Sequence, residues 1–316
     1  MYCKYVQTMI KVVNLEKHFG SVTAVNKISF SIQEGEIFGL LGPNGAGKST
    51  IIKILSTLLK SDSGSVFING KEINKNSDDC KKIIGVVPQE IALYEDFSAY
   101  DNLMFWGKLN SVSKTDLKQE IPKLLNLIGL EDRKSDLLKT YSGGMKRRIN
   151  IAAALLHNPK ILFMDEPTTG VDPQSRNKIF DIIETLNAKG ITVVYTTHYM
   201  EEVERLCNNI AIIDKGEIIA QGTIDELQAQ CDLNEYILLK TPNTTDLAIA
   251  MLQKTIQLPI VFEKSIISVQ CKPHKHLQSL LDNCKRLKIE ITDIQIQKTN
   301  LETIFLHLTG KQLRDY

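Results

Sequence analysis

The sequence contains no apolar run long enough to cross a membrane as a helix. A spanning helix needs roughly 18 or more consecutive apolar residues, and the longest candidates here, such as Ile151 to Leu156, are far shorter. The first residues, Met-Tyr-Cys-Lys-Tyr-Val-Gln-Thr, lack the apolar centre of a signal peptide. The chain also shows no basic amphipathic helix and no lipidation signal. We therefore expect a cytoplasmic protein that reaches a membrane only through a protein partner.

The composition offers little support for nucleic-acid binding, disulfides or zinc. Lys and Arg number 38 against 37 Asp and Glu, which gives a net charge of +1, and the basic residues are dispersed. Without a basic patch we expect no nucleic-acid partner. The six cysteines show no Cys-x-x-Cys spacing, which indicates reduced thiols. The 316 residues, 43% of them hydrophobic, are enough for about two globular domains.

One segment, Gly42 to Thr50, is a complete Gly-x-x-x-x-Gly-Lys-Ser phosphate-binding loop. It follows an apolar strand-like run and opens a helical pattern, which is the context that this motif requires. Its small residues let backbone N–H groups point at phosphate oxygens where a helix begins. We expect Lys48 to reach the β- and γ-phosphates and the Ser49 hydroxyl to ligate Mg²⁺. The nucleotide-binding residues predicted from the loop are Gly42, Pro43, Asn44, Gly45, Ala46, Gly47, Lys48, Ser49 and Thr50.

Polar residues follow three other apolar strand-like runs, at the strand ends where open α/β sheets bind ligands. Asp165 and Glu166 end the run that starts at Ile161. We expect Asp165 to hold Mg²⁺, directly or through water, and Glu166 to be the general base that activates the attacking water. Gln89 could reach the same ion and water, and His198 could hydrogen-bond the γ-phosphate. Taken alone, Gln89 would be a surface residue and His198 a structural histidine.

A second candidate anion site is the sequence Tyr141-Ser142-Gly143-Gly144-Met145, which precedes a helical run from Lys146 to His157. Ser142 can cap that helix, and the two glycines leave its first N–H groups bare for an anion. The first loop already holds the phosphates. A second anion site in one chain therefore suggests a ligand shared between two copies.

Short apolar strands alternate with helical patterns, which predicts an α/β core around a largely parallel sheet. A polar, mostly helical subdomain is expected at about residues 90–157, and a hairpin turned by Asp-Lys-Gly at Asn209 to Gly222. The candidate strands are Lys27 to Ile32, Glu36 to Leu41, Ser65 to Ile68, Ile83 to Val87, Ile161 to Met164 and Ile191 to Thr197. A polar helix and linker should close this first domain, residues 1–225, with the linker at 226–234.

Residues 235–316 predict a second, smaller α+β domain. Their pattern of strand, helix, two strands, helix and strand is the split βαβ, ferredoxin-like order, followed by a short last helix. Leu301, Ile304, Phe305 and Leu308 fall on one face of that helix. No catalytic constellation is found in this part of the sequence, and His274 and His276 are more typical of a solvated turn than of a metal site.

The motifs together resemble the ATP-binding subunit of an ABC transporter, a P-loop NTPase cassette, and they occur in the order of that family over residues 10–225. The correspondence covers Walker A (Gly42 to Thr50), the Q-loop (Gln89), the signature (Tyr141 to Met145), the end of Walker B (Met164 to Glu166), the D-loop (Asp172) and the H-loop (His198). Asp-Glu-Pro-Thr-Thr-Gly-Val-Asp-Pro and the ending Leu-Glu-Thr-Ile-Phe-Leu further resemble the daunorubicin-resistance and nodulation-factor export branch. Tyr141 and Met145 replace the usual signature Leu and Gln. Phe19 would be the adenine-stacking aromatic, unless it is a core residue.

This resemblance implies an ATPase that uses ATP and Mg²⁺ and pairs with itself head to tail. Each ATP would lie between Walker A of one copy and Ser142 to Gly144 of the other. A separate integral membrane permease would dock after Gln89, on residues 90–106. The aromatic residues there, Tyr94, Phe97, Tyr100 and Trp106, could equally be subdomain core. The expected cargo is a drug, lipid or glycolipid, and the alternative is a soluble ABC-type ATPase not engaged in transport.

Overall fold

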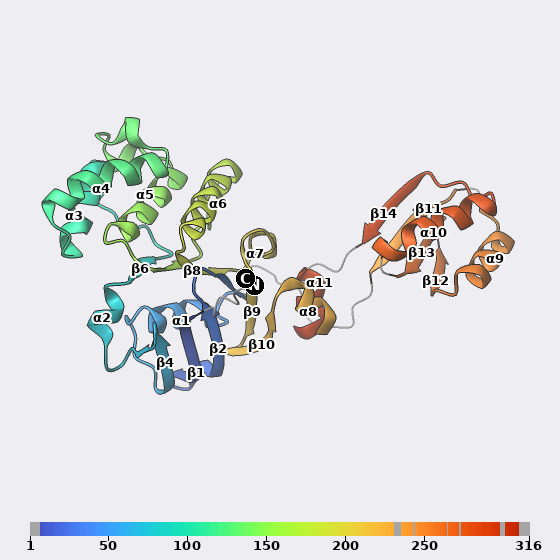
Figure 1. The fold of residues 1–316 in the computed structure, drawn as a ribbon, viewed down its shortest axis with the longest axis horizontal. Helices are drawn as coiled ribbons and strands as arrows, with labels where there is room; N and C mark the ends of the chain where they lie inside the picture. The colour runs from blue at the N-terminus through green and yellow to red at the C-terminus, as the bar shows by residue number, and fades with distance from the viewer. Residues whose placement is uncertain are drawn as a thin grey trace, which may run out of the picture. The chain divides into compact units, whose positions relative to one another are not determined.

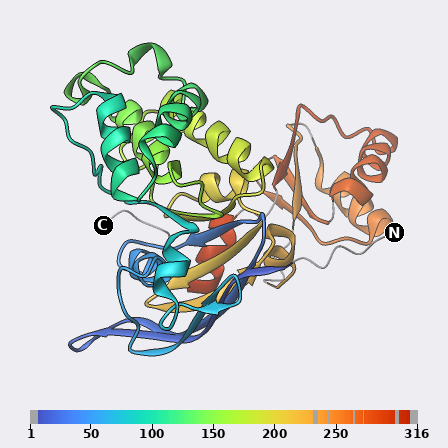
Figure 2. The ribbon, with the colours of Figure 1, turned by 60° about the vertical axis from the view of Figure 1, so that its left-hand side comes forward.

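The computed structural model describes residues 7–230, 235–242, 244–263, 265–271, 273–297 and 301–309. They form two compact units, which divide between Ile224 and Asp225 (Figures 1 and 2). Each unit has its own hydrophobic core. None of the described helices is both long and apolar enough to span a bilayer.

The centre of the first unit is a six-stranded sheet with the order β10-β9-β3-β8-β7-β6. All neighbouring strands are parallel except the antiparallel hairpin of β9 and β10. The strands are β3 (Ile37–Leu41), β6 (Ile84–Val87), β7 (Ile161–Asp165), β8 (Thr192–Thr197), β9 (Asn209–Asp214) and β10 (Glu217–Gly222). The predicted α/β core with a largely parallel sheet is therefore confirmed.

Alternate side chains of the central strands pack into two different cores. Phe163 of β7 joins a cluster with α1 (Lys48–Leu55), whereas its neighbours Leu162 and Met164 join a cluster with α3 to α6. Burial on both faces requires near-continuous apolar strands, as in Ile-Leu-Phe-Met. Figure 1 shows α5 and α6 on the side of this sheet opposite α1. The other α-helices that lie wholly within the unit are α2 (Ser77–Lys81), α3 (Ala99–Leu109), α4 (Lys114–Leu127), α5 (Gly143–Leu155), α6 (Pro173–Ala188) and α7 (Met200–Leu206).

A separate antiparallel sheet corrects part of the sequence interpretation. Its order is β2-β1-β4-β5, with the bounds β1 Thr8–Phe19, β2 Val22–Gln33, β4 Ser63–Ile68 and β5 Lys71–Glu72. Two predicted strands, at Lys27 to Ile32 and Ser65 to Ile68, belong to this sheet rather than to the parallel one. Its strand β1 was not predicted, because register shifts interrupt the alternation of apolar residues along it.

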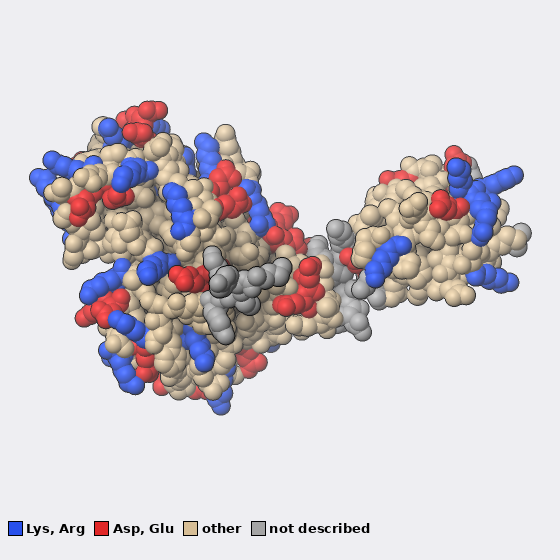
Figure 3. Space-filling view, in the orientation of Figure 1, with Lys and Arg blue, Asp and Glu red and all other residues tan. Residues whose placement is uncertain are grey.

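Helices α3, α4 and α5 lie within residues 90–157, where the sequence predicts a helical subdomain, and β9 and β10 form an antiparallel hairpin at the predicted place. Ser98 and Ser113 cap α3 and α4 by accepting hydrogen bonds from Asp101 N and Asp116 N. The hairpin turns at Lys215 and Gly216, which both have positive φ, as the tight turn of a two-residue hairpin requires. Figure 3 shows Lys and Arg interspersed with Asp and Glu on the face in view, with no field of one sign there.

The second unit contains an antiparallel sheet with the order β12-β13-β11-β14. Helices α9 (Asp246–Ile256) and α10 (Pro273–Arg286) share its core with β11 and β13. The strands are β11 (Tyr236–Lys240), β12 (Ile260–Glu263), β13 (Ile266–Gln270) and β14 (Asp293–Gln297). This connectivity is that of a split βαβ arrangement. The unit also includes α11 (Leu301–Thr309) and all but the first residue of α8 (Ile224–Gln230). In α11, Leu301, Ile304 and Phe305 are buried and Leu308 is exposed.

Candidate functional site

The phosphate-binding loop joins β3 to α1 and is closely packed at two glycines. A Cβ atom on Gly42 would lie 2.2 Å from the carbonyl oxygen of Ile213, and one on Gly47 would lie 2.3 Å from that of Ala24. Gly47 also has φ +108°, which disfavours any other residue. The loop therefore approaches its neighbours in a way that only glycine permits, and it ends at the first N–H groups of α1, which suit an anion.

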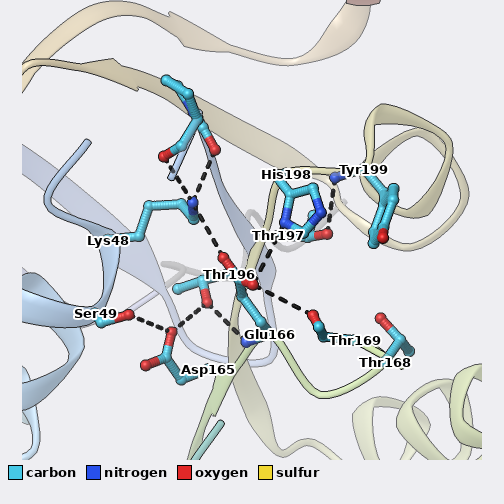
Figure 4. Close-up of polar contacts among 12 residues, drawn as sticks. Lys48, Ser49, Asp165, Glu166, Thr168, Thr169, Thr196, Thr197, His198 and Tyr199 are labelled. Atoms are coloured by element: carbon cyan, nitrogen blue, oxygen red, sulfur yellow. Dashed lines mark hydrogen bonds and ion pairs between the residues drawn. The ribbon is translucent and has the colours of Figure 1, made fainter. Parts of the chain in front are cut away.

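Lys48, the first residue of α1, is buried beneath the loop. Its Nζ donates to the carbonyl oxygens of Gly42 at 2.8 Å and Pro43 at 3.0 Å. It also lies 3.2 Å from Glu166 Oε1. Burial lowers the pKa of the Lys48 ammonium, and the Glu166 and Asp165 carboxylates oppose that effect. These contacts aim the cation at the centre of the site (Figure 4).

The Glu166 carboxylate lies where three side chains meet. One oxygen, Oε1, faces Lys48, while Oε2 accepts a hydrogen bond from Thr169 Oγ1 at 3.2 Å and lies 3.4 Å from His198 Nδ1. Glu166 has φ +44°, a strained value for a residue with a side chain, and its N–H donates to Thr196 Oγ1 at 2.9 Å. This turn after β7 brings Glu166 and His198, from neighbouring strand ends, onto one point, as Figure 4 shows.

Asp165 and Ser49 lie together beside this centre. The Ser49 hydroxyl donates to Asp165 Oδ1 at 3.1 Å, and Thr196 Oγ1 donates to the same oxygen at 2.8 Å. A hydroxyl oxygen next to a carboxylate is a donor set suited to a hard cation such as Mg²⁺. Groups of three or more His, Cys, Asp or Glu side chains that could hold a metal are not found among the described residues.

A pocket of about 420 Å³ opens over these residues. It is lined by Ala24, Asn44, Gly45, Gly47, Lys48, Ser49, Thr50, Gln89, Glu166, Thr169 and His198. Gln89 thus lines the same pocket as the phosphate-binding loop. The lining, as far as the structure describes it, contains none of Ser142, Gly143, Gly144, Asp172 and Phe19.

The residues from Ser142 to Gly144 begin α5, and Asp172 caps the neighbouring α6. Ser142 Oγ accepts a hydrogen bond from Met145 N at 3.3 Å, and Gly143 is exposed with open space around it. A Cβ atom on Gly144 would lie 2.4 Å from Ser175 in the first turn of α6. The Asp172 carboxylate accepts a bond from Ser175 N at 2.9 Å, and this hydrogen bond lowers the pKa of Asp172. Both helix starts are therefore presented together at the surface.

Three polar residues with close contacts to the site were missed in the sequence. Thr196 bridges Asp165 and Glu166, and Thr169 bonds Glu166. Arg147 of α5 donates to the carbonyl oxygens of Pro88 at 2.8 Å and Gln89 at 2.6 Å, which links the signature helix to Gln89. A buried threonine in an apolar strand is a signal that could have revealed Thr196. Arg147 carries no local signal, since its partners are backbone groups far away in the chain.

The aromatic residues after Gln89 divide into two groups. Tyr94 and Phe97 are exposed, and the Tyr94 ring lies 5.3 Å from Phe97 and 5.0 Å from Phe105, which is also exposed. Tyr100 and Trp106 instead pack against the subdomain core. The loop is held to α3 by the buried Asn102 side chain, whose Oδ1 accepts from Tyr94 N at 2.8 Å and whose Nδ2 donates to Tyr94 O at 2.9 Å. We call the three exposed aromatic residues Tyr94, Phe97 and Phe105, together with the exposed apolar residue Ile91, the aromatic surface.

Phe19, the predicted adenine platform, ends β1 and is 51% exposed. The Lys17 ammonium lies 5.5 Å from the centre of its ring. An exposed ring of this kind can stack on a base, and its exposure argues against the core alternative.

The family model for ABC transporters matches residues 25–169. The linearmycin resistance ATP-binding protein LnrL of Bacillus subtilis (strain 168) is 45% identical over 311 residues, which cover 97% of this chain and 100% of that protein. The chain belongs to the ATP-binding proteins of ABC transporters. The daunorubicin/doxorubicin resistance ATP-binding protein DrrA of Streptomyces peucetius is 34% identical, with 97% and 94% of the two chains covered. The Nod factor export ATP-binding protein I of Ralstonia nicotianae (strain ATCC BAA-1114 / GMI1000) is also 34% identical, with 97% and 95% covered.

A solved structure supports the same assignment. The ATP-binding cassette MJ0796, described as a dimer in a post-hydrolysis state bound to ADP and Pi, has a TM-score of 0.62 and 29% identity, covering 68% of this chain and 99% of that one. The predicted family, cassette fold and enzyme class are confirmed. This ABC protein is an ATP-hydrolysing subunit.

Proposed function

We propose that the chain powers a separately encoded membrane permease that exports a drug, lipid or glycolipid. The relatives support this direction of transport, because their names specify linearmycin resistance, daunorubicin resistance and Nod factor export. The protein would then lie on the cytoplasmic face of the membrane through its permease.

The observation that carries the proposed chemistry is the convergence of Lys48 and His198 on the Glu166 carboxylate, at 3.2 Å and 3.4 Å. A γ-phosphate entering the pocket would meet the Lys48 cation, and His198 would hydrogen-bond it. Glu166 would accept a proton from the attacking water, as a general base must lie within hydrogen-bond reach. Gln89, which lines the same pocket, would help to orient that water.

The proposed Mg²⁺ ligands are Ser49 Oγ and, directly or through water, Asp165. Thr196 fixes the Asp165 carboxylate through the 2.8 Å hydrogen bond to its Oδ1. Magnesium bound to ATP usually keeps few protein ligands, together with phosphate oxygens and waters. Its contribution there would be to neutralise phosphate charge.

A head-to-tail homodimer would complete the site. The pocket contains the phosphate-binding loop, Glu166 and His198, whereas Ser142, Gly143 and Asp172 are exposed at the starts of α5 and α6. A second copy would bring its Ser142 to Gly144 N–H groups to the γ-phosphate held by the first. Hydrolysis would remove the shared phosphate contacts and let the dimer reopen.

Substitution of Glu166 by Gln tests these roles. Glu166→Gln keeps the shape but removes the base, so hydrolysis should fall about 10²- to 10⁴-fold while ATP binding persists. The bound ATP should then hold two chains together, and sedimentation should detect an ATP-dependent dimer. The matched control is Lys48→Ala, which should neither turn over nor dimerise. A Glu166→Gln protein that hydrolyses ATP at the wild-type rate and sediments as a monomer would refute both the role of Glu166 as general base and the head-to-tail dimer.

The aromatic surface is the proposed permease docking site. Arg147 ties the backbone at Pro88 and Gln89 to the signature helix, so motion at the nucleotide can reach this surface through a short path. Its rings suit an apolar helix of the permease. The surrounding charges, including the Lys146–Glu95 and Lys139–Asp96 ion pairs, form a polar rim.

Charge substitutions in the aromatic surface should uncouple ATP hydrolysis from transport. Tyr94→Lys and Phe97→Glu should leave the basal ATPase activity of the isolated chain in place, while co-sedimentation with membranes and efflux fall together. Leu58→Glu is the matched control, because Leu58 is an exposed apolar residue outside that surface. Fractionation should be repeated with each candidate permease gene deleted. Membrane association that survives every deletion, or that never occurs when a candidate permease is present, would contradict the transporter assignment and favour the soluble ATPase alternative.

A further inference from the structure

A buried carboxylate on α7 joins the two halves of the catalytic site without lining its pocket. Glu202 is 1% exposed and accepts hydrogen bonds from three hydroxyl groups. Thr168 Oγ1 donates to Oε1 at 2.7 Å, while Tyr195 OH and Thr197 Oγ1 donate to Oε2 at 2.9 Å and 2.8 Å. The carboxylate is thereby held on both oxygens.

The hydroxyl groups come from the segments that carry Glu166 and His198. Thr168 lies two residues after Glu166, in the turn that leads to Asp172, and Thr197 directly precedes His198. Thr197 Oγ1 also accepts a bond from Tyr199 N at 3.0 Å, which fixes the backbone on the far side of His198. Figure 4 shows Thr168, Thr197 and Tyr199 around the Glu166–His198 contact. Glu202 therefore ties the turn after β7 to the end of β8.

A cation from α6 approaches the same carboxylate. Arg176 Nε lies 3.6 Å from Glu202 Oε1, and the Arg176 guanidinium lies 5.4 Å from the centre of the Tyr199 ring. The Tyr199 ring contacts His198, with 4.0 Å between the two ring centroids. Because α6 follows directly on its cap Asp172, this chain of contacts leads from His198 to the helix start that a second copy would meet.

Burial of a carboxylate costs free energy unless hydrogen bonds and an opposite charge compensate it. An apolar residue of similar size could fill the same space without that cost, but it could not hold three hydroxyl groups in fixed directions. The Glu202 carboxylate is therefore better suited to fixing the positions of these hydroxyl groups than to filling space in the core.

We propose that Glu202 is a positioning residue that sets the separation of Glu166 and His198 and connects His198 to α6. The proposal rests on the catalytic roles proposed for Glu166 and His198. Glu202 acts through these residues, because its hydrogen bonds and its ion pair lead to the segments that carry them.

The substitution Glu202→Gln should lower kcat while leaving nucleotide binding unchanged. Glutamine has nearly the same shape, but its NH₂ group is a donor facing hydroxyl groups that also donate, and it has no charge for Arg176. A displacement of the catalytic groups by a fraction of an ångström should lower kcat about 10- to 100-fold. The KM for ATP and the Kd for ATP of the single chain should stay within about twofold, since the phosphate-binding loop is untouched.

Two controls separate positioning from general stability. Glu201→Gln changes the exposed neighbour on the same helix and should behave as wild type. Thr168→Ser keeps the hydroxyl and should keep kcat, whereas Thr168→Val removes it and should lower kcat. The double variant Thr168→Val with Glu202→Gln should lose less than the product of the two single effects, as residues in one network do. All rates are taken per folded protein, with unfolding followed by circular dichroism.

The outcomes are distinguishable. A wild-type kcat in Glu202→Gln, or equal losses in Thr168→Ser and Thr168→Val, would overturn the positioning role. Should Glu202→Gln fail to fold, the comparison of the two Thr168 variants decides the question by the same criterion. Wild-type turnover in Glu166→Gln would instead show that the proposed site itself is wrong, whatever Glu202 does.

Discussion

At the scale of single residues, Lys48 is a buried cation, and we expect its protonation state at high pH to depend on whether a nucleotide is bound. Burial lowers its pKa, so the free protein loses this proton at a lower pH than an exposed lysine would. Phosphate oxygens next to Nζ favour the charged form and raise the pKa again. Nucleotide binding should therefore take up a proton once the pH exceeds the lowered value, and the affinity should fall there by up to about tenfold per pH unit.

Calorimetric titration with Mg-ADP between about pH 7 and pH 10 checks this prediction without hydrolysis. Titrations in buffers of different ionisation enthalpy give the number of protons taken up. The Lys48→Met variant should bind weakly and show no such uptake. An affinity that stays constant up to the pKa of an ordinary lysine would mean that burial does not perturb this group.

The residues with local signals could be predicted, and those whose roles depend on long-range contacts could not. Lys48 and Ser49 follow from the spacing of the phosphate-binding loop, and Asp165 from its place at a strand end. Thr196 acts through partners 30 or more positions away, and Arg147 through partners 58 or more positions away. Such contacts exist only after the strands have been ordered in the sheet, so no local pattern announces them.

At the scale of elements, the strands buried on both faces were the easiest to predict. Strand β7 begins at Ile161 as expected, and β8 differs from the prediction by one residue, because continuous apolar runs mark central parallel strands. Strand β1 was missed, since positive φ at Asn14 and shifted register break its alternation. Sequence periodicity also could not show that β2 and β4 belong to the separate antiparallel sheet and not to the central one. The sheet that a strand joins depends on tertiary contacts.

The starts of helices were likewise predictable where the signal is local and unpredictable where it depends on tertiary contacts. Ser142 caps α5, as its position before a helical run predicts, and the helix begins three residues before the expected Lys146. What the sequence could not reveal is the neighbour of Gly144, where Ser175 leaves no room for a side chain. The starts of α5 and α6 are thus packed as one surface, and this supports the proposed role of both in contacting a second copy.

At the scale of the whole molecule, we propose that the first unit is the complete nucleotide-binding domain, with the limits 1–225 expected from the sequence. All the residues that line the pocket lie between Ala24 and His198. The second unit has its own core, formed by α9, α10 and the strands β11 and β13. We propose that this unit strengthens or regulates the dimer, since it follows a chain segment that already contains every residue lining the pocket.

Truncation after Gln230 tests this division. The shortened chain should fold and bind Mg-ADP with the affinity of the full chain, because no residue lining the pocket is removed. Calorimetric titration measures the affinity, and Lys48→Ala in the same truncated chain is the control for specific binding. In the Glu166→Gln background the truncated chain should form the ATP-dependent dimer only at higher protein concentration, if the second unit strengthens pairing. A truncated chain that is folded by circular dichroism but binds no nucleotide would show that the domain boundary is misplaced.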